Sequence, residues 1–173
     1  GAILVIAIVF AFLMNGRATV ITLTALPLSL VAAILTMKAM GASINTMTLG
    51  GLAIALGALV DDAIIVVENI VRRLGENQKR PDGQRKAPIH VVFEATREIQ
   101  GSIVFATLII MLVFLPLFFL SGVEGRLMVP LGLAYVISLA ASLFVAITVT
   151  PVLSSLLLTR HKEGEGAHEP ALV

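Results

Sequence analysis

Apolar runs long enough to cross a lipid bilayer follow one another along most of this sequence. The hydrocarbon core of a bilayer is about 30 Å thick, so a spanning helix needs about 20 mostly apolar residues. Hydrophobic residues make up 58% of the 173-residue chain and charged residues only 13%, which excludes an ordinary soluble domain. We therefore expect an all-α fold, a polytopic bundle of about five transmembrane helices in contact with membrane lipid.

Turns and charges divide the sequence into segments. The first apolar run, Ala2 to Met14, has 13 residues and would reach only about 20 Å as a helix. We therefore expect a first span that is cut and a chain that is a piece of a longer protein. The expected segments are a truncated transmembrane helix at 1–14, transmembrane helices at 19–38, 46–72, 101–120 and 127–159, a cytoplasmic loop with an amphipathic surface helix at 73–100, and a tail at 160–173 without periodicity, expected to be disordered.

Basic residues gather on one side of the expected bundle. Because successive spans alternate in direction, only Lys38 and Arg126 fall on the other side. Loops rich in lysine and arginine are cytoplasmic, so we expect the N-terminal end outside and the C-terminal end in the cytoplasm. The residues on the basic side are Arg17, Arg72, Arg73, Lys79, Arg80, Arg85, Lys86, Arg97, Arg160 and Lys162.

The span at 46–72 carries two adjacent carboxylates near its middle, Asp61 and Asp62. One aspartate near the centre of a spanning helix costs about 2.5–3.5 kcal/mol on insertion scales, and two adjacent like charges also repel each other. Leucine or alanine would pack at lower cost. The pair therefore indicates a functional site inside the membrane.

Small residues accompany both carboxylates on the helix surface. Residues four apart share a face, which places Gly57 and Ala53 beside Asp61, and Ala58 beside Asp62. Small side chains let a neighbouring helix approach closely. We therefore expect both carboxylates to face protein and not lipid.

A third acid, Glu68, lies seven residues after Asp61 on nearly the same face, about 10 Å nearer the cytoplasmic end. The three acids predict a path for protons or cations. An ion pair at the helix end with Arg72 or Arg73 explains Glu68 about equally well, so both interpretations stay open.

No basic side chain lies at mid-depth in the expected spans. The counter-charge for the acid pair must then come from another part of the full protein or from a bound ion. The chain has no cysteine, and we expect no resident metal, cofactor or nucleic-acid partner. The polar side chains nearest to mid-depth are Thr107, Ser138, Ser142, Thr148 and Thr150.

Three strings resemble one family of membrane transporters. The acidic span contains Gly57-Ala-Leu-Val-Asp-Asp-Ala-Ile-Ile-Val-Val-Glu-Asn69, which resembles the fourth transmembrane helix of resistance–nodulation–division (RND) efflux pumps. The run from Phe114 to Leu127 resembles the following helix and its loop, and the run from Thr148 to Leu153 resembles the end of the sixth. The resemblance implies that the chain covers helices two to six of a transporter with about twelve.

The resemblance implies a function and partners. RND pumps are proton/substrate antiporters of the bacterial inner membrane, secondary transporters and not enzymes, and they are driven by the proton motive force. Asp61 and Asp62 would form the proton relay with Glu68 as a lesser member, and the second half of the transporter would supply a lysine. The expected partners are two further copies in a homotrimer, a periplasmic adaptor and an outer-membrane channel.

The substrate class stays open between metal cations and toxic small molecules. The loop from Ser121 to Arg126 resembles the heavy-metal-cation branch of the family. Some divalent-cation members carry a further acid where this chain has Ala55, however, and the copper and silver members use methionine pairs where Leu59 and Val66 stand here.

Two other functions remain as alternatives. One is a non-efflux relative of the same superfamily, linked to lipids or to secretion. The other is an intramembrane aspartyl protease, which needs two aspartates on two different helices. Asp61 and Asp62 lie on one helix, about 100° apart around its axis, which disfavours the protease.

Overall fold

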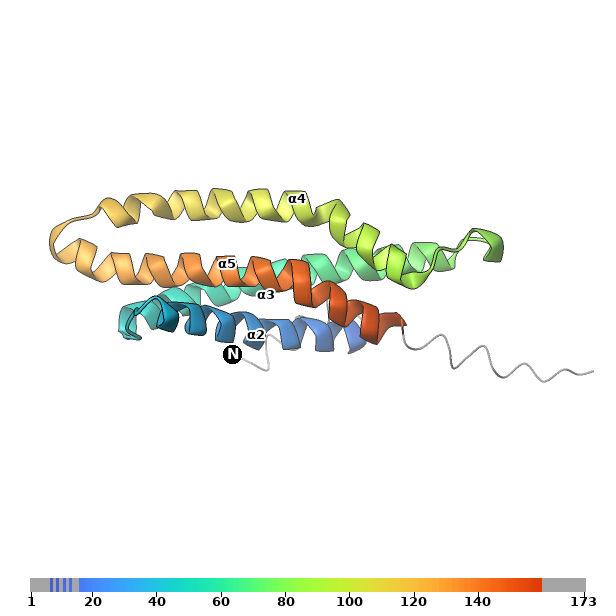
Figure 1. Cartoon of the computed structure of the whole chain (residues 1–173), viewed down its shortest axis with the longest axis horizontal. Coiled ribbons are helices and arrows are strands. Elements are labelled where there is room, and N and C mark those ends of the chain that lie inside the picture. Colours follow the sequence, from blue (N-terminus) through green and yellow to red (C-terminus); the bar gives the residue numbers. More distant parts are fainter. Residues whose placement is uncertain (1–6, 8, 10, 12, 14–15, 160–173) are drawn as a thin grey trace, which may run out of the picture.

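The computed structural model describes residues 7, 9, 11, 13 and 16–159, and in this part of the chain the regular structure is helical throughout. Four long apolar helices run back and forth, each long enough to cross a membrane (Figure 1). This confirms the all-α class expected from the hydropathy pattern. The helices are α2 (Gly16–Ala39), α3 (Thr46–Gln78), α4 (Pro88–Phe114) and α5 (Gly122–Thr159), with short 3-10 helices η1 (Asp82–Gln84) and η2 (Leu115–Phe119) between them.

Helix α5 holds the bundle together. It packs against α2, α3 and α4, and its contact with α3 is the most extensive in the described part of the chain. Figure 1 shows α5 in orange between α4 in yellow and α2 in blue. Helices α2 and α4 do not touch each other within the described residues. Among the described helices, α4 is therefore the outermost member, and it contacts α3, α5 and η2.

Local signals define where α2 ends and where α3 begins. Gly41 has φ +73°, a left-handed conformation that closes a helix and suits glycine. The Asn45 side chain then caps α3 by accepting a hydrogen bond from the Thr48 backbone N–H at 3.0 Å, while the Asn45 N–H donates to Thr48 Oγ1 at 2.7 Å. This reciprocal pair is a capping box, which satisfies two donors at the start of a helix.

The seam between α3 and α5 is closest where α3 has no side chain. A Cβ atom at Gly51 would overlap the carbonyl oxygen of Leu131, so only glycine lets the two backbones meet there. Further along the seam, large apolar side chains fill the space. The Tyr135 ring stacks on Phe114 with ring centroids 4.2 Å apart, and a cluster of Ala55, Leu59, Tyr135 and Leu139 is buried around it.

Several helix boundaries differ from the expected segments. Helix α3 continues to Gln78, six residues past the expected end of its span, because Asn69 and Asn77 find partners on the neighbouring segment. Residues 88–114 form one helix in place of a surface helix followed by a separate span. Gly101 does not interrupt it, since glycine costs a helix only about 1 kcal/mol. Helix α5 begins at Gly122, five residues earlier than expected.

Two expected segments fall largely or wholly outside the described residues. In the segment 1–14, the described residues are helical, and Val9 and Leu13 are buried in a cluster with Ile21 and Val67. The tail at 160–173 lies outside the described part of the chain.

Candidate functional site

The acid pair lies near the midpoint of α3. Of the described helices, α3 has the most extensive contact with α5. Asp61 and Asp62 are successive helical residues and therefore point about 100° apart. Their surroundings differ accordingly, because Asp62 is half-buried and Asp61 is exposed. The two carboxylates thus occupy two faces of one helix.

Asp62 faces α5. The Ser142 hydroxyl of α5 lies against its carboxylate, and Ser142 is itself buried. Oxygen Oδ2 of Asp62 is buried and accepts no hydrogen bond within the described part of the chain. A buried oxygen left without a donor costs about 1–3 kcal/mol, and more when it is charged. This position therefore favours a proton on the carboxylate or a cation beside it.

Asp61 lies on a stripe of α3 that no described residue covers. The stripe follows helical spacing through small residues, and a Cβ added at Gly57 would meet nothing within 4 Å. The expectation that both carboxylates face protein is therefore met for Asp62, whereas the described part of the chain leaves Asp61 open. The members of this α3 stripe are Ala53, Gly57, Asp61, Ile65 and Glu68, all exposed.

Glu68 takes no part in the ion pairs at the end of α3. The Arg72 guanidinium donates to Asn69 Oδ1 at 2.6 Å and lies 3.5 Å from Glu76. Arg73 pairs with Glu76 at 2.9 Å and also with a glutamate of α4. The helix-end ion pair that offered an alternative explanation of Glu68 is therefore absent from the described residues.

Hydroxyl groups in the spans are mostly used by their own helices. Of the five residues expected near mid-depth, four donate to a backbone carbonyl four or five residues earlier: Thr107 to Ile103, Ser138 to Ala134, Thr148 to Phe144 and Thr150 to Val145. Ser142 alone among these five faces an acid of the site.

A polar network that sequence reasoning missed joins α3 to α4 beyond the acid pair. The buried Asn69 side chain donates from Nδ2 to the Ala95 carbonyl at 2.7 Å, and Arg73 Nε donates to Glu98 Oε2 at 2.9 Å. One available signal was the position of Asn69 directly after Glu68. Asn69 and Asn77 are eight residues apart, so they lie on roughly the same side of a helix and indicate a polar face there.

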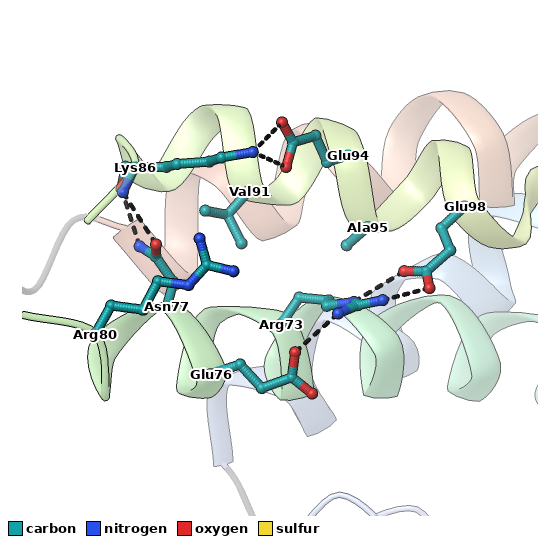
Figure 2. A pocket seen from close by; sticks show the side chains of 9 residues that line it. All are labelled: Arg73, Glu76, Asn77, Arg80, Lys86, Val91, Glu94, Ala95 and Glu98. Atoms are coloured by element: carbon teal, nitrogen blue, oxygen red, sulfur yellow. Dashed lines mark hydrogen bonds and ion pairs between the residues drawn. The ribbon is translucent and has the colours of Figure 1, made fainter. Parts of the chain in front are cut away.

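The second asparagine, Asn77, fastens the loop to α3. Its Nδ2 donates to the Lys86 carbonyl at 2.9 Å, and the Lys86 N–H donates back to Asn77 Oδ1 at 3.0 Å. Figure 2 shows these bonds beside the Lys86–Glu94 ion pair, whose closest atoms are 2.7 Å apart. A cavity of about 310 Å³ lies between the two helices here. Its charged lining residues balance, since Arg73, Arg80 and Lys86 face Glu76, Glu94 and Glu98.

Comparisons with known proteins give a consistent likeness. Residues 1–170 match the family model described as the AcrB/AcrD/AcrF family. The chain is 38% identical over 164 residues to swarming motility protein SwrC of Bacillus subtilis, which covers 95% of this chain. It is also 38% identical over 160 residues to cobalt-zinc-cadmium resistance protein CzcA of Cupriavidus metallidurans, covering 91% of this chain.

A third relative carries another kind of name. The chain is 37% identical over 162 residues, or 94% of its length, to multidrug resistance protein MdtC of Escherichia coli. In each of the three cases the match covers 15% of the relative. The chain thus spans about one seventh of the length of the curated relatives that it resembles.

Proposed function

Because the chain belongs to the AcrB/AcrD/AcrF family of RND transporters, we propose that it forms part of the membrane domain of a proton-driven efflux pump. The observation that carries this proposal is the buried oxygen of Asp62, which has no donor in the described part of the chain. An acid pair at mid-helix without a cation is costly in a membrane. Uptake and release of protons is a function that accounts for the cost.

The two faces of α3 suggest how the pair works. A protonated Asp62 is neutral, so its burial against α5 costs less than that of the anion. When the proton leaves, the anion needs a cation nearby. That cation would reach the pair from the open side, where the stripe of small residues around Asp61 leaves room for another helix. We assign it to a lysine in the second half of the transporter.

Glu68 extends the path toward the end of the helix. It is exposed, lies on the same stripe as Asp61 and has no ion pair within the described residues. It therefore has the freedom to exchange protons with water at the cytoplasmic side. We give it a lesser role than the pair, because it lies outside the most apolar surroundings.

The proposed surroundings of the chain follow from the family and from the charges. The stretch from Arg72 to Arg97, which includes the loop between α3 and α4, would face the cytoplasm of a bacterium, because it carries seven of the twelve lysine and arginine residues. The N-terminal end would then lie on the periplasmic side of the inner membrane. The complete protein would form a homotrimer and join a periplasmic adaptor and an outer-membrane channel.

The proposed substrates are metal cations or toxic small molecules. The names of the relatives point both ways, to cobalt, zinc and cadmium resistance for CzcA and to multidrug resistance for MdtC. The name of SwrC refers to swarming motility and not to resistance. That name keeps a non-efflux member of the superfamily, linked to lipids or secretion, as the second candidate.

An intramembrane protease has less support. Both aspartates lie on α3. The sequences of α2, α4 and α5 contain no aspartate. Within the described residues, no aspartate of another spanning helix therefore faces Asp61 or Asp62 across a space for the catalytic water.

The test uses the full-length transporter that contains this chain. Asp61→Asn and Asp62→Asn are each reconstituted in proteoliposomes with a pH-sensitive dye inside, and substrate-driven proton flux is measured with a metal cation and with a cationic dye. We expect flux at background for both variants, with normal expression. Glu124→Gln serves as the control, because it removes an acid near a helix start. Normal proton-coupled export by either asparagine variant would rule out the relay.

A further inference from the structure

The outward side of α4 carries a second stripe with a different make-up. Phe93, Arg97, Gly101, Phe105 and Leu108 follow one another at spacings of three or four residues, so they share one side of the helix. Phe93 is 63% exposed and Phe105 is 68% exposed. This α4 stripe therefore presents large apolar side chains on both sides of one cation.

Arg97 is a cation without a counter-ion. It is exposed, and within the described residues it has neither an ion pair nor a side-chain hydrogen bond. Arg73 and Lys86, at the same end of the bundle, are both paired with glutamates of α4. The lack of a partner at Arg97 thus sets it apart from the network that closes the α3–α4 end.

The position of Arg97 along α4 corresponds to the edge of a bilayer. It lies eight residues before Phe105, about 12 Å along the axis, and four residues after Phe93, about 6 Å on the other side. The helix beyond Phe105 is apolar up to η2, and the helix before Phe93 leads into the charged loop. A cation at this boundary lies at the depth of lipid headgroups.

Lipid fits this stripe better than another helix does. Association between helices in a membrane depends on small residues that let backbones approach, and Gly101 is the one small residue among the five. The stripe on α3 is the reverse, with Ala53 and Gly57 leading to Asp61. Large exposed apolar side chains suit contact with acyl chains.

We propose that Arg97 binds the phosphate of an anionic phospholipid, with Phe93 seated in the interface beside the headgroup. The planar guanidinium of arginine donates in pairs to phosphate oxygens. The side chain of Lys79 also lacks an ion pair in the described part of the chain, which adds positive potential at this end. That potential favours lipids with net negative charge over zwitterionic ones. The inference uses the proposed orientation only to place the lipid in the cytoplasmic leaflet.

Photocrosslinking in the full-length transporter tests this directly. A photoreactive phenylalanine analogue at position 93 is irradiated in nanodiscs made of phosphatidylcholine and phosphatidylglycerol, and the adducts are identified by mass spectrometry. We expect lipid adducts in which phosphatidylglycerol is enriched about fivefold over its share of the bilayer, the factor typical for one basic residue near an anionic surface. A probe at Ile65, on the α3 stripe, is expected to yield protein adducts.

Substitution of the cation separates specific binding from simple contact. In the Arg97→Gln background, phosphatidylglycerol adducts at position 93 should fall to their bulk share, whereas Arg97→Lys should retain part of the enrichment. Protein adducts at position 93, or an enrichment that Arg97→Gln leaves unchanged, would overturn the proposal. The measurement needs no transport, so a failed relay test leaves it unaffected.

Discussion

Helices α3 and α4 are both apolar enough to cross a membrane, yet they are built for different neighbours. In the most apolar window of α3, 44% of the residues are buried inside the bundle, against 11% in α4. One open stripe of α3 carries the small residues Ala53 and Gly57 ahead of Asp61, whereas the outward stripe of α4 carries Phe105 and Leu108. Lipid is as apolar as leucine, so only small or polar residues favour a protein neighbour. The difference teaches that residue size, not hydropathy, distinguishes a helix that awaits protein from one that faces lipid.

The largest expected effect lies at the contact between α3 and α5. Gly51→Leu places a side chain against the Leu131 backbone, which overpacks the seam at a cost of about 3 kcal/mol. The thermal unfolding temperature of the purified full-length transporter should fall accordingly. Gly101→Leu on α4 is the control, because a Cβ there meets nothing within 4 Å. Equal stability of the two variants would mean that α3 is not tightly packed at this point.

The next effect concerns the open stripes themselves. Gly57 and Gly101 are both exposed helical glycines with nothing within 4 Å of an added Cβ. If α3 awaits another helix, Gly57→Leu should reduce substrate export by about tenfold, in line with an overpacking cost of about 1–3 kcal/mol. Gly101→Leu should leave export nearly unchanged, since lipid adapts to a new side chain. Similar export by both variants would break the comparison between the two helices.

A smaller effect is expected where the two helices are joined. Asn69→Leu removes the hydrogen bond to the Ala95 carbonyl and the acceptor for Arg72. A buried side-chain hydrogen bond contributes about 1 kcal/mol, so the free energy of unfolding should decrease by about 1–2 kcal/mol. Gln100→Leu, at an exposed position of α4, provides the matched amide control. A larger loss in the control than in Asn69→Leu would contradict the joining role.

The smallest effect belongs to the exposed ion pairs near the loop. Glu94→Gln breaks the ion pair with Lys86. The side chains of both residues are exposed to solvent. Exposed pairs contribute little and are screened by salt. We expect at most a slight decrease in the unfolding temperature at low salt and none at high salt. A clear decrease that persists at high salt would show that this pair matters more than its exposure suggests.

Much of the fold could be predicted from periodicity and length. The apolar runs implied spanning helices, and α3 begins at Thr46, the residue where its span was expected to begin. The far end of α3 could not be predicted, because Asn69 and Asn77 continue the helix through partners that lie 26 and 9 residues away in sequence. Gly101 was likewise expected to begin a separate span, but α4 continues through it from Pro88 to Phe114.

The acid pair and its neighbours along α3 could be identified from the sequence, but the surroundings of each carboxylate could not. Helical spacing correctly grouped Asp61 with Gly57, and Asp62 with Ala58. Which group meets α5 depends on how the helices pack, and packing is not encoded in the spacing of one helix. The partner of Glu68 could not be predicted from sequence distance either. Arg72 and Arg73 are the nearest cations in sequence, but both form ion pairs with Glu76.

The missing side chain at Gly51 has a mechanical consequence. Where two backbones touch, the helices cannot come any closer, so a relative tilt of α3 and α5 that keeps this contact pivots near Gly51 and Leu131. The displacement from such a tilt grows with distance from the fulcrum. Asp62 lies 11 residues from Gly51, about 16 Å along the helix axis. At that distance, a slight tilt of α3 against α5 would change the space around the Asp62 carboxylate.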